Sequence, residues 1–138
     1  GATTLIDVAT LTGACVVALG DRYTGAFSNS DELMSKIVQA SILAGENIWR
    51  LPMGDEEYDN LNASTVADIA NCGKKCGATA AARFLGEFVE KKPWVHLDIA
   101  GTSESDEDTE IYSKGGTGAA TMLLYEVVKL MEKPYKSY

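Results

Sequence analysis

Two mostly apolar segments, residues 4–9 and residues 94–101, give this chain the pattern of a buried sheet. Strands that are apolar on both sides are typical of a parallel sheet covered on both faces. Helical stripes of apolar residues fall between and after these segments, at residues 33–44, 78–90 and 117–131. Strands that alternate with helices predict an α/β fold, here a partial three-layer α/β/α sandwich with a mainly parallel sheet.

The boundaries of the first long helix are also visible in the sequence. Asn29 with Glu32 three residues later fits a capping box, and Gly45 provides a stop. Residues 24–28 predict a second, short strand. Residues 15–19 fit either a short helix or a strand, and the pattern does not decide between them.

Charge and composition exclude several classes of protein. The chain carries 20 acidic against 12 basic residues, a net charge of -8, which argues against a nucleic-acid partner because phosphate contacts need clustered cations. No apolar run reaches the roughly 18 residues of a membrane span, and the first residues lack the basic region of a secretory signal. The cysteines Cys15, Cys72 and Cys76 therefore predict reduced thiols in a cytoplasmic protein.

Small residues follow both apolar strands. Residues 10–13 come directly after the first strand, and residues 100–103 end the late one. In open α/β sheets, ligands gather beyond the carboxyl ends of the strands. Small side chains let a ligand approach the backbone, so these segments are candidate binding loops, although two ordinary tight turns would look the same.

Acidic and imidazole side chains do not form an obvious catalytic group. His96 lies in the middle of a strand, where a hydrogen-bonded core histidine is expected. Asp98 points the same way two residues later, so the pair could also be two ligands or half of a triad. Asp7 and Asp68 are isolated acids, and no strand-to-helix nucleophile motif is present.

Two loops have charged or glycine-rich compositions. Residues 104–110 are acidic and could bind a cation, but they lack the EF-hand register, so a solvated loop is expected. Residues 114–118 resemble a phosphate loop without matching its spacing, and a tight helix start is expected. A nucleotide-binding domain would depend on this second loop alone.

A series of short motifs, in order along almost the whole chain, resembles the M17 leucyl aminopeptidases, also called cytosol aminopeptidases. The motifs are Asp7-Val8-Ala9-Thr10-Leu11-Thr12-Gly13-Ala14, Thr24-Gly25-Ala26-Phe27-Ser28-Asn29, Trp49-Arg50-Leu51-Pro52-Met53, Ala67-Asp68-Ile69-Ala70-Asn71, Gly77-Ala78-Thr79-Ala80-Ala81, Trp94-Val95-His96-Leu97-Asp98-Ile99-Ala100-Gly101 and Gly116-Thr117-Gly118.

The resemblance implies a metal-dependent hydrolase that removes N-terminal residues from peptides with two adjacent divalent metals, zinc or manganese, in a cytosolic homo-oligomer. It also implies substrate contacts for this chain. The Leu11 carbonyl and the Gly13 amide would bind the peptide backbone, and Thr10, Ala100 and Ser103 would line the pocket for the N-terminal side chain. Ser103 is smaller than the residue expected there, which leaves the side-chain preference open.

The family's metal-ligand motif, Asn-Thr-Asp-Ala-Glu-Gly-Arg, occurs nowhere in the 138 residues. The resemblance therefore implies that this chain holds no catalytic residue and no metal ligand. We expect residues 1–138 to be the C-terminal portion of an M17 catalytic domain, inactive in isolation. The alternative is a non-catalytic assembly module with the same fold, because an unpaired sheet edge and uncovered apolar surface favour association.

Overall fold

A computed structural model describes residues 1–55, 61–62, 64–72 and 77–132. The strands and helices alternate up to the strand at residues 94–98, as the apolar pattern predicts, and two strands of two residues each then precede the last helix. In chain order the elements are β1 (Leu5–Ala9), α1 (Gly13–Leu19), β2 (Thr24–Ser28), α2 (Asp31–Ala44), β3 (Ile48–Arg50), α4 (Ala78–Gly86), β4 (Trp94–Asp98), β5 (Glu104–Ser105), β6 (Gly115–Gly116) and α5 (Thr121–Met131).

The main sheet has the strand order β1-β4-β2-β3. β1 runs parallel to β4, and β2 runs parallel to β3, while β2 and β4 are antiparallel. The sheet is therefore mainly parallel, as predicted. Every residue of β2 and β4 is buried, because these central strands are covered on both faces.

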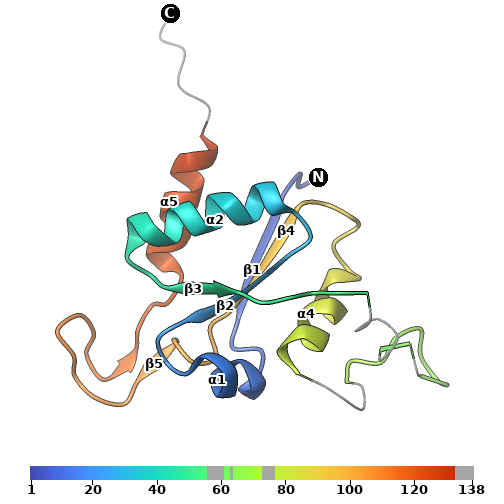
Figure 1. Ribbon diagram of the computed structural model, residues 1–138, viewed down its shortest axis with the longest axis horizontal. Helices are drawn as coiled ribbons and strands as arrows, with labels where there is room; N and C mark the ends of the chain where they lie inside the picture. The colour runs from blue at the N-terminus through green and yellow to red at the C-terminus, as the bar shows by residue number, and fades with distance from the viewer. Residues whose placement is uncertain (56–60, 63, 73–76, 133–138) are drawn as a thin grey trace, which may run out of the picture.

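The helices form layers on the two faces of the sheet. α2 and α5 pack together on one face, and α1 and α4 lie on the other (Figure 1). This arrangement confirms the three-layer prediction. The core beneath α2 and α5 consists of ten buried apolar residues, which are Ala26, Leu33, Met34, Ile37, Ala40, Val95, Leu97, Ala120, Leu123 and Val127.

The start of α2 differs from the prediction. Ser30, not Asn29, is the cap, and its hydroxyl accepts a hydrogen bond from the Leu33 amide at 3.3 Å. The Asn29 side chain bonds instead to the Lys92 carbonyl and the Trp94 amide, both at 2.9 Å. The predicted capping box was wrong because the Asn29 amide holds the start of β4.

Several elements are shorter than predicted. α4 ends at Gly86 instead of continuing to residue 90, and Glu90 and Lys91 turn the chain with φ of 52° and 61°. α5 starts at Thr121 instead of residue 117, because Ala120 has a left-handed φ of 69°. The predicted helix start at residues 114–118 is not helical, and Gly115 and Gly116 within it form the short strand β6.

Two further segments can be compared with their predictions. The ambiguous residues 15–19 belong to helix α1, which Thr12 caps by accepting a hydrogen bond from the Cys15 amide at 3.0 Å. The late strand ends at Asp98, three residues earlier than predicted.

Among the described residues, no helix is both long and apolar enough to cross a membrane.

Candidate binding site at the strand ends

The carboxyl ends of β1 and β4 lie side by side. Ala9 is the register partner of Asp98, and the Ile99 amide continues the pairing by donating to the Ala9 carbonyl at 2.9 Å. The residues that follow each strand therefore emerge at the same edge of the sheet. This places residues 10–13 and residues 100–103 next to each other, although almost ninety residues of chain separate them.

The Asp98 carboxylate links these two segments. Its Oδ1 atom accepts hydrogen bonds from the amides of Leu11 and Ala100, each at 3.1 Å. Its Oδ2 atom accepts the Thr12 hydroxyl proton at 2.8 Å. Asp98 is only 1% exposed, and these three donors replace the water that burial removes.

The five predicted site residues differ in their exposure. Thr10 and Gly13 are exposed, whereas Leu11, Ala100 and Ser103 are partly buried. Gly13 is the first residue of α1, and no atom lies within 4 Å of the position that a Cβ would take. Gly13 is therefore accessible from outside, whereas Ala100 and Ser103 lie deeper.

Hydrogen bonds of three threonines hold the loop that carries Ala100 and Ser103. The hydroxyls of Thr24 and Thr102 lie 2.8 Å apart, and the Thr117 hydroxyl donates to the Thr102 carbonyl at 2.6 Å. The Thr117 amide donates to the Ser103 carbonyl at 3.0 Å. Sequence reasoning missed these threonines, because no local pattern indicates that residues 24, 102 and 117 meet.

Gly101 is required by a close backbone approach. A Cβ at this position would lie 2.0 Å from the Gly20 carbonyl oxygen. No side chain fits at such a distance, so the two loops can touch only because residue 101 is glycine. The end of α1 therefore supports the loop after β4.

Cys15 lies behind the site as a structural thiol. Its Sγ atom is 3.8 Å from the Asp98 carbonyl oxygen, and the side chain is 1% exposed. Burial raises the pKa of the Cys15 thiol, and the nearby Asp98 charge raises it further. A thiol that stays protonated is a poor nucleophile and a poor metal ligand, so Cys15 serves packing.

His96 is a core histidine, as predicted, with an acidic partner that was not predicted. The ring is fully buried and makes stacked contacts with both Phe27 and Trp94. Its Nδ1 atom lies 2.5 Å from Asp7 Oδ1, and the Trp94 indole donates to Asp7 Oδ2 at 2.6 Å. Asp7 is therefore not isolated, and the interpretation of His96 and Asp98 as one functional pair is wrong.

Comparison with known proteins decides the family. The sequence model of the cytosol aminopeptidase family, catalytic domain, matches residues 1–125. The chain belongs to the cytosol aminopeptidase family.

Relatives of the family are similar to this chain over most of its length. Probable cytosol aminopeptidases of Alkaliphilus metalliredigens and Alkaliphilus oremlandii are 52% and 48% identical over 134 residues, 96% of this chain and 27% of each relative. A mutant of tomato leucine aminopeptidase superposes with a TM-score of 0.83 and 43% identity, over 91% of this chain and 24% of that one. The chain thus spans about a quarter of the relatives it matches.

The residues described by the structure do not fit the two-metal centre implied for this family. Within those residues, no three His, Cys, Asp or Glu side chains are grouped closely enough to hold a metal ion. Asp7 and Asp98 are already engaged by the partners given above, and Asp68 is exposed. In the acidic loop, Asp108 accepts a hydrogen bond from the Lys114 amide at 2.8 Å. Cys76 lies outside the described residues.

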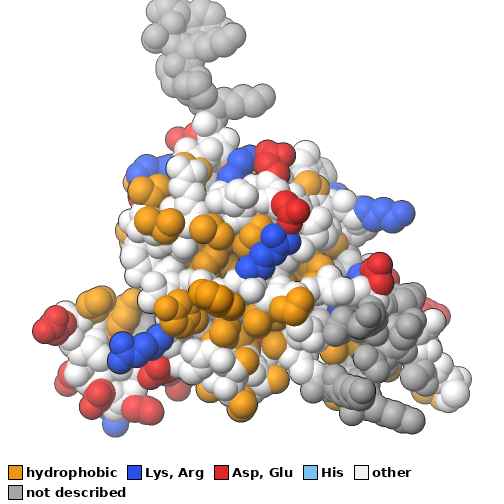
Figure 2. Space-filling model, viewed as in Figure 1, with side chains coloured by type: hydrophobic (Ala, Val, Ile, Leu, Met, Phe, Trp, Pro, Cys, Tyr) orange, Lys and Arg blue, Asp and Glu red, His pale blue; other side chains and the backbone are white. Residues whose placement is uncertain are grey.

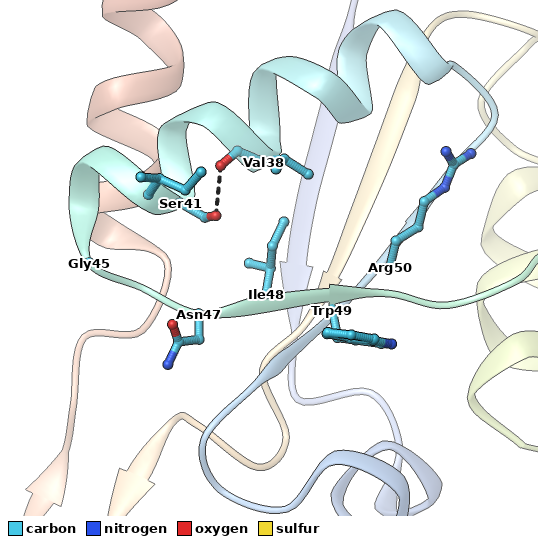
Figure 3. A pocket seen from close by; sticks show the side chains of 8 residues that line it. Val38, Ser41, Gly45, Asn47, Ile48, Trp49 and Arg50 are labelled. Atoms are coloured by element: carbon cyan, nitrogen blue, oxygen red, sulfur yellow. Dashed lines mark hydrogen bonds between the residues drawn. The ribbon is translucent and has the colours of Figure 1, made fainter.

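A separate hollow lies between α2 and the edge strand β3, two strands away from β4 (Figure 3). It has a volume of about 670 Å³. Val38, Ile42 and Ile48 line it with apolar side chains, and Trp49 borders it. Ile48 points toward α2, whereas Trp49 lies on the opposite side of the strand (Figure 3). Hydrophobic side chains gather on this face of the molecule (Figure 2).

Proposed function

We propose that this chain is the C-terminal portion of the catalytic domain of an aminopeptidase, and that it supplies walls of the pocket that binds the N-terminal residue of a peptide. The observation that carries the proposal is the shared hydrogen bonding of the Leu11 and Ala100 amides to one oxygen of Asp98. This contact brings together two segments that the family resemblance assigns to the substrate. Membership of the cytosol aminopeptidase family supports the same activity and a cytoplasmic location.

Each pocket residue has a role that its position supports. The Leu11 carbonyl and the Gly13 amide bind the peptide backbone, and the open space around Gly13 leaves room for it. Thr10, Ala100 and Ser103 line the pocket for the N-terminal side chain. Ala100 and Ser103 are small, so they leave space for a large apolar side chain such as leucine.

The metals of the parent enzyme, zinc or manganese, have no ligands among the residues described. Bound metals of this kind supply an activated water and polarise the scissile carbonyl. The residues of this chain orient the peptide and exclude water from one side of it. No step of the hydrolysis is assigned to them.

The proposal predicts that the chain restores activity when it is placed in a complete catalytic domain. A chimera of the Alkaliphilus metalliredigens relative, in which this chain replaces the matching 134 residues, should hydrolyse leucine-p-nitroanilide in the presence of manganese. The same relative with the segment deleted is the control. A soluble, folded chimera without activity above that control would contradict the proposal.

The isolated 138-residue chain should show no aminopeptidase activity in the same assay. The physical reason is that a peptide held without an activated water is not hydrolysed at a measurable rate. Turnover by the isolated chain that a chelator abolishes would show that it holds its own metal centre, and would overturn this part of the proposal.

A second candidate function is assembly without catalysis, and one observation favours it. The hollow between α2 and β3 exposes apolar side chains next to a sheet edge that no other described strand pairs with, and such surfaces promote association. The expected partner is a second copy of this chain. The two functions are compatible, since pocket walls and an assembly surface lie at different places on the sheet.

A further inference from the structure

We propose that Asp98 is a positioning residue for peptide binding, which sets the separation and direction of both pocket walls. This inference rests on the proposed function, because it concerns how the same pocket is held. Asp98 itself does not touch the peptide. It acts through the backbone of Leu11, through Ala100 and through the cap residue Thr12.

One carboxylate group binds the backbone of both pocket walls. The amides of Leu11 and Ala100 converge on the same oxygen, Oδ1, so these two backbone positions stay within two hydrogen-bond lengths of each other. Neither loop can move outward without leaving a buried polar group unpaired. Such a loss is unfavourable enough to keep the loops together.

The second carboxylate oxygen of Asp98, Oδ2, determines the direction of the Gly13 amide. Oδ2 accepts the Thr12 hydroxyl proton, and the same hydroxyl accepts a hydrogen bond from the Cys15 amide. These two bonds fix the first turn of α1 relative to Asp98. The Gly13 amide, which lies in that turn, is therefore aimed by a residue of β4.

Asp98 is itself held firmly enough to serve as a reference point. It ends the central strand β4 and pairs with Ala9 on one side and Gly25 on the other. Gly25 has no side chain, and a Cβ there would lie 2.6 Å from Cys15 Sγ. Gly25 thus leaves room for the packed layer of Cys15 and Asp98.

The chemistry of the side chain defines informative variants. An asparagine at position 98 keeps one oxygen that can accept both amide protons, and its NH₂ group can donate to the Thr12 hydroxyl. Asp98→Asn therefore preserves the positioning, whereas Asp98→Ala removes it. Thr12→Val removes both bonds of the Thr12 hydroxyl, the one to Asp98 Oδ2 and the one from the Cys15 amide, and leaves the two amide bonds to Oδ1 in place, whereas Thr12→Ser retains all of them.

Kinetics of the active chimera test the inference. Asp98→Ala should lower kcat/KM about 100-fold, the effect of misplacing a bound substrate by roughly 1 Å, with the larger part of the loss in KM. The kcat/KM of Asp98→Asn should stay within about tenfold of that of the parent chimera, a change that corresponds to about one hydrogen bond. Thr12→Val should raise KM, and Thr12→Ser should restore it.

The matched control is Ser28→Ala. Ser28 is 8% exposed and donates to the Trp94 carbonyl at 2.6 Å, at the opposite end of β4. This variant should lower the melting temperature without changing KM. A merely structural role for Asp98 would give the Ser28 result, with less active enzyme and unaltered KM.

Amide exchange in the isolated 138-residue chain provides an independent measurement. Asp98→Ala should accelerate exchange at the Leu11 and Ala100 amides, and Asp98→Asn should leave both protected. If Asp98→Ala does not fold, the Thr12 variants still decide the question. An inactive parent chimera overturns the proposed function, whereas an active chimera whose KM is the same in Asp98→Ala and Thr12→Val overturns only the inference about Asp98.

Discussion

Asp7 and Asp98 lie on neighbouring strands of the sheet, yet their surroundings give them different roles. Asp7 lies on the edge strand β1, where its side chain is 42% exposed and pairs with buried His96. Asp98 lies on the central strand and is almost inaccessible, so its carboxylate depends entirely on protein donors. The donors are backbone amides and a hydroxyl, which a sequence cannot distinguish from those of any other turn. Burial and strand position, which the residue type alone does not reveal, therefore distinguish these two aspartates.

Gly101 gives a prediction at the same scale. Gly101→Ala should destabilise the chain by about 1–3 kcal/mol, because its Cβ must push away a backbone oxygen that cannot rotate aside. The measurement is urea unfolding followed by circular dichroism. The control is Gly116→Ala, since no atom lies within 4 Å of that Cβ position, and it should change stability by less than about 0.5 kcal/mol. Equal stability of the two variants would refute the close approach to Gly20.

At the scale of elements, the apolar pattern predicts the existence and order of the strands and long helices. Their ends are less predictable, because tertiary contacts decide them. The Asn29 side chain is capable of capping α2, but it bonds to the backbone at residues 92 and 94, which are far away in sequence. Likewise, Gly115 and Gly116 look like a helix start and instead pair with β5. The strand-end position of the site follows from the fold class, whereas its hydrogen bonds do not.

The cap of α2 gives a prediction about this element. Ser30→Ala should cost about 1 kcal/mol, because the Leu33 amide loses its acceptor at the helix start. Ser35→Ala is the matched control within the same helix, since its exposed hydroxyl bonds only to the Asp31 carbonyl, and it should be close to neutral. Thermal unfolding of the two variants measures the difference. A neutral Ser30→Ala would mean that the hydrogen bond to Leu33 contributes nothing to stability.

For the whole molecule, the sheet separates the two surfaces to which we assign a function. The strand-end site lies beyond β1 and β4, while the apolar hollow lies beside β3 at the other edge of the sheet. Its lining contains Arg50 and no carboxylate, although the chain has a net charge of -8. Arg50 is paired with Asp31 at 2.6 Å, which offsets its charge, so two copies can meet at this hollow with little charge repulsion. A two-fold axis would place the same patch of each copy against the other.

Self-association is the prediction that belongs to this scale. Multi-angle light scattering at high protein concentration should give a mass of at least twice the 14.7 kDa of one chain, because association removes exposed apolar area from water. Ile42→Asp should shift the mass toward the monomer, since Ile42 is 76% exposed and lines the hollow. Ile111→Asp should leave the mass unchanged, because Ile111 is 80% exposed but does not line it. A monomeric parent chain would contradict self-association, and an equal response of the two variants would show that copies meet at a surface other than the hollow.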